Sequence, residues 1–155
     1  MLRSALGLAL SAIAFATIGC GASDSSIPTT PLSGTIEGKT FEMKSAFALV
    51  GMTPSERFVV IRDADASCDD GSGTKDGELL VTAEIPWKKG ATEAVDGAHP
   101  VTLAHVPDSV IATAGEVDVL AAPTDLGAVG GFLLRADAGD GQTKVEGEVK
   151  VTNCE

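Results

Sequence analysis

The sequence predicts an all-β domain over residues 34–155, an antiparallel β-sandwich or a small β-barrel of about eight strands. Apolar and polar residues alternate there with a period of two in short runs, as in strands with one buried face. Clusters of Gly, Pro and Asp separate the runs, and 18 glycines suit many tight turns and bulges. No stretch carries the apolar stripe and caps of a helix. Sandwiches and barrels share this pattern, so the choice between them stays open.

The first strands are expected between residues 35 and 50. A hairpin is predicted around the turn Gly38-Lys39, with Ile36 and Phe41 on its two arms. The following residues up to Val50 are ambiguous, because their alanines also suit a helix. We interpret this run as strand.

The later strands differ in how sharply the pattern marks them. The run Phe-Val-Val-Ile between Arg57 and Arg62 predicts a strand buried on both faces. Residues 78–85 alternate well, with Leu80 as the exception. The clearest strand is 143–152, where valines share one face and charged residues the other. Further strands are expected at residues 100–106, 109–113, 116–121 and 130–136.

The first 20 residues form a separate unit. Arg3 supplies a positive charge, the run from Leu6 to Ile18 is apolar or small, and small residues close it. That layout is typical of a secretory signal peptide. The run is shorter than the ~20 apolar residues that a spanning helix requires. We therefore expect residues 1–19 to be a signal peptide, removed on export.

The end of this unit, Ile18-Gly19-Cys20, resembles the lipobox of bacterial lipoproteins, in which a small residue precedes a cysteine. One departure is Thr17, where the box usually carries Leu, Val or Ile. The resemblance implies cleavage before Cys20, a diacylglycerol on its sulfur and an acyl chain such as palmitate on its amino group. Gly21 in place of Asp favours the outer membrane over the inner one. An ordinary secretory signal, cut a few residues later, is the alternative.

Residues 20–33 are small, polar and proline-bearing, which predicts a lipidated, flexible tether between membrane and domain. The part of the chain that follows resembles small lipoprotein domains of bacteria with large secretomes. The resemblance lies in the opening from Ser33 to Phe41, a strand running into Cys68 and a closing strand at Cys154. Most of those domains have no assigned activity. The resemblance implies a β domain and no particular chemistry.

The number of cysteines predicts one disulfide. With Cys20 assigned to lipid, Cys68 and Cys154 remain, and exported proteins keep disulfides. The bridge would fasten the last strand to the body of the domain. A metal site built from these two sulfurs lacks further soft ligands nearby.

Charge and aromatic content exclude some partners. The chain has 11 Lys and Arg against 22 Asp and Glu, a net charge of −11, which repels the phosphate backbone of nucleic acids. It has no Tyr and one Trp, so it lacks the stacking platforms that bind single strands. We expect no nucleic-acid partner, and contact with a membrane through the N-terminal lipid.

An acidic segment, residues 63–78, is the sharpest local feature. Its carboxylates are typical of a calcium-binding loop, although the spacing fails the helix-loop-helix template because its glycine comes one residue late. The alternative is a solvated connection rich in turn residues. The candidate calcium ligands are Asp63, Asp65, Asp69, Asp70 and Asp76.

The remaining candidates are few. His99 and His105 are expected on one strand face, about 20 Å apart, too far to share a metal. Trp87 follows a strand and precedes two lysines, so it is either a contact residue or folded back over the core. No Gly-x-Ser-x-Gly nucleophile motif and no phosphate-binding glycine loop occurs.

These observations predict a cell-envelope lipoprotein with a non-catalytic binding or structural β domain and no cofactor. Two alternatives stay open. One is an adhesion-type domain that binds calcium through residues 63–78. The other is a hydrolase whose site is assembled from residues scattered along the chain.

Overall fold

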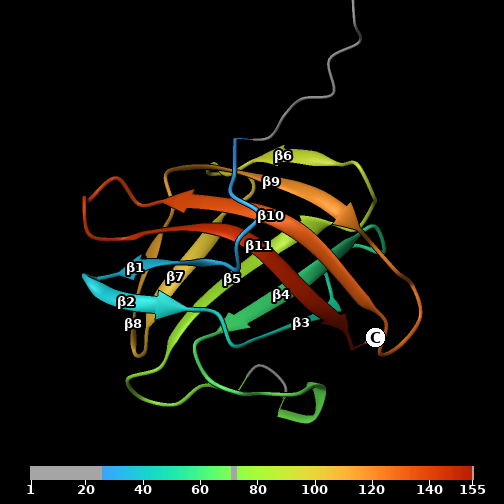
Figure 1. The fold of residues 1–155 in the computed structure, drawn as a ribbon, viewed down its shortest axis with the longest axis horizontal. Helices are drawn as coiled ribbons and strands as arrows, with labels where there is room; N and C mark the ends of the chain where they lie inside the picture. Colours follow the sequence, from blue (N-terminus) through green and yellow to red (C-terminus); the bar gives the residue numbers. More distant parts are fainter. Residues whose placement is uncertain (1–25, 71–72, 155) are drawn as a thin grey trace, which may run out of the picture.

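The computed structural model describes residues 26–70 and 73–154, so the expected signal peptide and Cys20 lie outside the described residues. The described chain is all-β, as predicted, with one short 3-10 helix, η1 (Cys68–Asp70). Its strands form one sheet that curls into a half-barrel (Figure 1). They are β1 (Ser33–Ile36), β2 (Lys39–Glu42), β3 (Ser45–Val50), β4 (Glu56–Arg62), β5 (Leu79–Pro86), β6 (Thr92–Ala94), β7 (Val101–His105), β8 (Asp108–Ile111), β9 (Ala114–Ala121), β10 (Val129–Asp137) and β11 (Lys144–Asn153).

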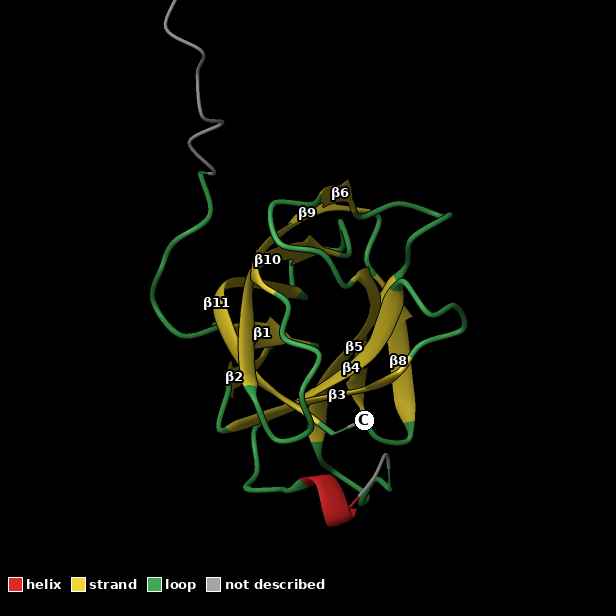
Figure 2. Cartoon of the chain, turned by 90° about the vertical axis from the view of Figure 1, so that its right-hand side faces the viewer, coloured by secondary structure: helices red, strands yellow, loops and turns green. Residues whose placement is uncertain are grey.

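The strand order along the sheet is β6-β9-β10-β11-β3-β4-β5-β7-β8, with the β1–β2 hairpin attached to β11. Neighbouring strands are antiparallel except for β11 and β3, which run parallel with Thr152 opposite Phe47. This parallel contact departs from the purely antiparallel sheet that the sequence predicts. Because the sheet curls, β1, β2 and β11 lie on one side of the molecule and β4, β5 and β8 on the other (Figure 2).

The last strand, β11, occupies the middle of the sheet. One of its edges pairs with β10 along nine residues, and the other edge pairs with β1 and then with β3. Its alternation is confirmed, because Val145, Val149 and Val151 are fully buried while Lys144 and Lys150 are exposed. The sheet therefore depends on the strand that comes last in the described chain.

The core lies inside the curl, where each strand contributes alternate side chains. β5 shows the pattern: Leu79, Val81, Ala83 and Ile85 point inward, while Leu80 is buried outside this inner cluster. The largest fully buried side chains are Phe41, Phe47, Phe132, Leu32, Ile36, Ile61, Ile85, Leu103 and Leu134. Apart from Phe47, which is buried outside it, these side chains belong to one inner cluster.

The structure refines two features of the sequence pattern. The run up to Val50 is strand rather than helix, but Met43 and Lys44 divide it into β2 and β3. There the backbone leaves the hairpin and joins the main sheet, with Met43 N donating to Leu32 O and Lys44 N to Arg62 O. The short β6 was not expected, because Thr-Glu-Ala has no apolar alternation, and it forms by pairing with β9.

The segment expected as a tether packs on the domain from Ser26 onward. Ile27 and Leu32 are buried, and Arg135 of β10 donates to the hydroxyl and carbonyl oxygens of Ser26. The segment crosses β11 at Gly147, where a Cβ would lie 2.6 Å from Thr30 O and φ is +145°. Glycine is required there by both the close approach and the backbone conformation. The packed part of the chain therefore starts before residue 34.

Candidate functional site

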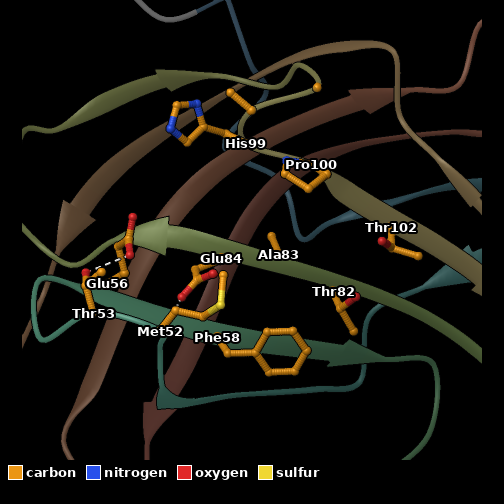
Figure 3. Close-up of a pocket in the computed structure, with 12 residues that line it drawn as sticks. Met52, Thr53, Glu56, Phe58, Thr82, Ala83, Glu84, His99, Pro100 and Thr102 are labelled. Carbon is orange, nitrogen blue, oxygen red and sulfur yellow. Dashed lines mark hydrogen bonds between the residues drawn. The ribbon is translucent and has the colours of Figure 1, made fainter.

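A groove of about 470 Å³ lies on the outer face of β4, β5 and β7 (Figure 3). Its volume lies within the ~300–1,000 Å³ range typical of small-molecule sites. Two loops wall it, the β3–β4 loop and the loop that leads into β7. The lining residues are Met52, Thr53, Glu56, Phe58, Thr82, Ala83, Glu84, Gly97, Ala98, His99, Pro100 and Thr102.

Strand alternation sets the floor of the groove. On β4 and β5 the inward residues enter the core, so Phe58 and Glu84 point outward, and they are cross-strand partners. Thr82 of β5 and Thr102 of β7 form the next partner pair along the same face. Phe58, Thr82, Glu84 and Thr102 are all half-buried. The floor thus combines an aromatic ring, two hydroxyls and a carboxylate.

The β3–β4 loop forms one wall and is held by the floor. The backbone N–H of Met52 donates to Glu84 Oε1, and Thr53 Oγ1 donates to Glu56 Oε2 at 2.6 Å. Gly51 permits this approach, because a Cβ there would lie 2.8 Å from Glu56 O and 2.9 Å from Glu84 Oε1. The Met52 side chain is left 89% exposed beside the groove.

The opposite wall carries His99 and Pro100. The His99 ring directs Nε2 at Glu93 Oε1, 3.0 Å away, and Nδ1 at Asp96 Oδ1, 3.7 Å away. Backbone N–H donation from Ala98 and His99 holds the pKa of Asp96 below its usual value. Burial raises the pKa of Glu93, although His99 opposes this shift. Both ring nitrogens of His99 therefore already face carboxylates, one on β6 and one on the loop that leads into β7.

The groove is lined by negative rather than positive side chains. Glu56 and Glu84 contribute carboxylates, whereas no Lys or Arg is among the described residues that line it. Phe58, Met52 and Pro100 supply apolar surface next to these carboxylates (Figure 3). Chemically, the arrangement can accept an apolar group together with hydrogen-bond donors or positive charge.

The predicted disulfide is confirmed: Cys68 and Cys154 are bonded, with their Cα atoms 5.5 Å apart. It ties η1, in the acidic segment, to the residue after β11. Beyond the bridge, Cys154 N donates to Ala48 O of β3 at 2.9 Å. The acidic segment lies at the bottom edge of the molecule in Figure 2, where η1 is drawn in red. Ala66, Ser67 and Cys68 lie beside Phe47 there.

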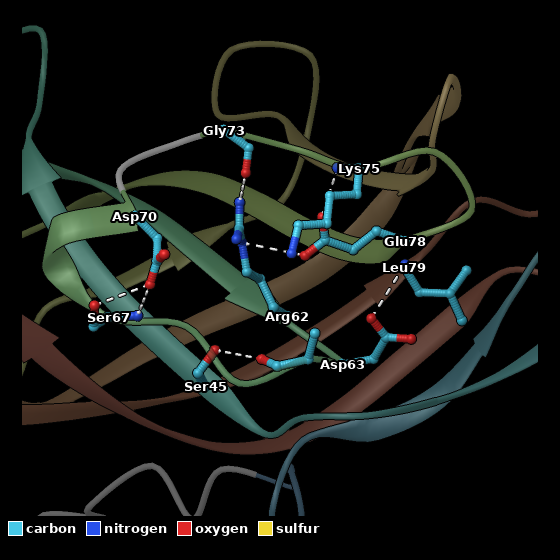
Figure 4. A network of polar contacts seen from close by, with 10 residues as sticks. Ser45, Arg62, Asp63, Ser67, Asp70, Gly73, Lys75, Glu78 and Leu79 are labelled. Carbon is cyan, nitrogen blue, oxygen red and sulfur yellow. Dashed lines mark hydrogen bonds and ion pairs between the residues drawn. The ribbon is translucent and has the colours of Figure 1, made fainter.

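Several acidic side chains of this segment serve its own folding (Figure 4). Asp70 Oδ2 accepts from Ser67 N at 2.7 Å and from Ser67 Oγ at 2.9 Å, and these bonds lower the pKa of Asp70. Asp63 Oδ1 accepts from Leu79 N at 3.2 Å. Asp65, Asp69 and Asp76 are exposed. In the described parts of the chain, no three His, Cys, Asp or Glu side chains are placed to hold a metal ion.

A buried arginine anchors the same segment. Arg62 is 5% exposed, its Nη2 donates to Gly73 O, and its Nε lies 3.4 Å from Glu78 Oε1 (Figure 4). Its guanidinium also lies 5.7 Å from the centre of the Phe47 ring. This contact set joins the acidic segment to the outer face of β3 and β4.

Trp87 is folded over the end of the core, one of the two expected placements, and is 9% exposed. Its indole Nε1 donates to Pro123 O at 2.7 Å, and the Arg57 guanidinium lies 5.9 Å from its ring centre. The surface offered to a partner by Trp87 is accordingly small.

The two histidines do not share a strand. β7 begins at Val101, after His99, and ends at His105. The His105 ring instead joins β7 to the β1–β2 turn, with Nε2 2.6 Å from Lys39 Nζ and Nδ1 3.2 Å from Glu37 Oε2. The expected single strand fails because Pro100 ends the preceding loop rather than continuing a ladder.

Comparison with known proteins gives no matching family model, no matching curated protein and no matching solved structure. Across the described residues, no helix has the length and apolarity needed to cross a membrane. The evidence for a functional site in this protein thus comes from the geometry of the chain alone.

Sequence reasoning did not single out the groove. Met52, Phe58, Glu84 and Thr102 come from three strands and a loop, and nothing in their spacing along the chain brings them together. The one available signal is Phe58, an aromatic residue at an outward position of a strand that the sequence marks as buried on both faces.

Proposed function

We propose that this chain is an exported, lipid-anchored envelope protein whose half-barrel binds a small ligand in the groove between the β3–β4 loop and the loop before β7. The binding role rests on one observation, a preformed groove whose floor combines an aromatic ring with a few convergent polar groups. The floor is set by paired strands, so little rearrangement is needed on binding.

Two observations support the exported, anchored part of the proposal. The Cys68–Cys154 disulfide is a bond that persists in oxidising compartments. The N-terminal sequence, ending in Ile18-Gly19-Cys20, has the layout of a cleaved and lipidated signal. Two or three acyl chains at Cys20 would bury many CH₂ groups at ~0.8 kcal/mol each, so anchoring would be stable.

Mass spectrometry of the protein extracted from membranes tests this part. We expect a chain that begins at Cys20, carries acyl groups and has Cys68 and Cys154 oxidised. A Cys20→Ser variant is the matched control and is expected to lose the lipid while keeping the disulfide. Material that retains Met1 and has three alkylatable thiols contradicts the proposal.

Millimolar calcium is expected to leave the melting temperature of the protein unchanged, and a rise in that temperature would favour the adhesion-type alternative.

A further inference from the structure

We propose that the groove takes small organic cations with an apolar body, such as amines that carry an aromatic or alkyl group. This inference rests on the proposed binding role and specifies its ligand class. The volume of about 470 Å³ suits a molecule of that size rather than a folded partner.

The apolar body of such a ligand would contact the floor of the groove and the apolar side chains of its two walls. Phe58 lies on the floor near the flexible thioether of Met52, and the ring of Pro100 lies on the opposite wall, across β5 (Figure 3). Met52 is 89% exposed, so it is free to close over a bound group, and methionine adapts its shape to varied apolar ligands. A cation beside the Phe58 ring also gains from its quadrupole.

The positively charged group of the ligand would bind the carboxylates of Glu84 and Glu56. Each carboxylate has one hydrogen bond to the β3–β4 loop, from Met52 N and from Thr53 Oγ1 respectively. A carboxylate offers about four acceptor positions, so both keep acceptor capacity for an ammonium group. Thr82 and Thr102 add hydroxyls on the floor.

No fixed positive charge among the described lining residues competes for these carboxylates. His99 also lines the groove, but its ring nitrogens face Glu93 of β6 and Asp96 rather than Glu56 or Glu84. The net charge of −11 adds a general attraction for cations and repulsion for anions. Charge complementarity therefore selects a cationic ligand over a neutral or anionic one.

The test uses the full chain in its disulfide-bonded form, labelled with ¹³C at the methionine methyl groups. Of the three methionines in the sequence, Met1 lies in the expected signal peptide, so the methyl resonances of Met43 and Met52 can be assigned by substitution. Met52 lines the groove, while Met43 lies at a separate hollow beside Pro31 and serves as the internal control. The probes are 4-phenylbutylamine, 4-phenylbutanol and 4-phenylbutyrate, which share a body and differ in charge.

We expect the amine to shift the Met52 methyl resonance saturably, leave Met43 unmoved, and bind about tenfold more tightly than the alcohol. The double variant Glu56→Gln/Glu84→Gln is expected to remove most of that preference and leave alcohol binding unchanged. Glutamine keeps an oxygen acceptor for Met52 N and Thr53 Oγ1, so the loop should stay in place. Glu42→Gln/Asp76→Asn removes two exposed carboxylates outside the groove and is the matched control for charge.

The outcomes separate the two proposals. Equal binding of amine, alcohol and butyrate at Met52, or an amine preference that survives the double variant, overturns the cation inference and leaves groove binding standing. If none of the three probes shifts the Met52 resonance up to its solubility limit, both the cation inference and the proposed groove binding are overturned. Equal shifts at Met52 and Met43 show non-specific association and overturn the inference as well.

Discussion

Thr143 joins two turns at one end of the half-barrel. It is 1% exposed, its Oγ accepts from Glu37 N at 3.1 Å and donates to Asp140 Oδ2 at 2.9 Å. Asp140 Oδ1 also accepts from Gln142 N at 2.8 Å and Thr143 N at 2.7 Å. One threonine and one aspartate thereby fix the β10–β11 turn against the β1–β2 turn.

The Asp140 carboxylate should make part of the stability depend on pH. The backbone N–H of Gln142, with the Thr143 bonds, holds the pKa of Asp140 below its usual value of 3.8. A lowered folded-state pKa adds stability that is present above pH ~4 and is lost as pH falls through the folded-state pKa. Asp140→Asn should therefore flatten the fall of unfolding free energy below pH 4, measured by urea denaturation. Asp125→Asn, near the opposite end of β10, is the control for the loss of one carboxylate.

Arg62 and Glu78 form a buried ion pair whose side chains are 6% and 7% exposed. Glu78→Gln is expected to lower the unfolding free energy by about 3 kcal/mol, because the guanidinium then stays buried without its counter-charge. The double variant Arg62→Met/Glu78→Leu should cost less than the sum of the single changes. Urea denaturation measures all of these, and a loss below about 1 kcal/mol for Glu78→Gln would mean that the pair is dispensable.

At the scale of elements, the disulfide holds the acidic segment to the end of β11. It closes a loop between residues 86 apart in the sequence, which in the chain-entropy model is worth about 4–5 kcal/mol. The paired variant Cys68→Ser/Cys154→Ser should lose most of this in urea denaturation, and wild-type protein in reductant should match it. Equal stability of the oxidised protein and the variant would contradict this expectation.

The N-terminal segment is the second element whose role can be measured. Because Leu32 is fully buried and the segment is bonded to β11 through Leu32 N and Glu148 O, Leu32→Ala should cost about 2–5 kcal/mol. Thr29→Ala, an exposed change in the same segment, should cost little. Thermal denaturation that shows no difference between the two variants would restore the tether interpretation for residues 26–32.

At the scale of the whole molecule, the sequence predicts strands well where one face is buried. β5 and β11 follow the alternation of their apolar residues, and β4 follows from its continuous apolar run. The order of strands could not be predicted, because alternation says which face is buried and not which strand lies alongside. The groove is hidden for the same reason, since Phe58, Glu84 and Thr102 become neighbours only after β4, β5 and β7 pair.

The place of β11 gives a test of cooperativity. A chain that ends at residue 143 lacks the strand that contacts β10, β1 and β3, so we expect it to remain unfolded, with poor dispersion in its amide NMR spectrum. A chain shortened only by Cys154 and Glu155 loses the disulfide and keeps β11, and it should fold with reduced stability. A dispersed spectrum from the shorter chain would show that the remaining strands fold without β11.

A polypeptide that passes through a narrow channel from its amino end must stay threadable until the passage is complete. If the chain is exported as proposed, the late position of β11 has a consequence, because the ten residues of Lys144–Asn153 supply the pairing that closes the sheet. The strands that emerge before β11 lack the neighbour that joins β10 to β1 and β3. On this route, passage of those strands would precede both closure of the half-barrel and formation of the Cys68–Cys154 bond.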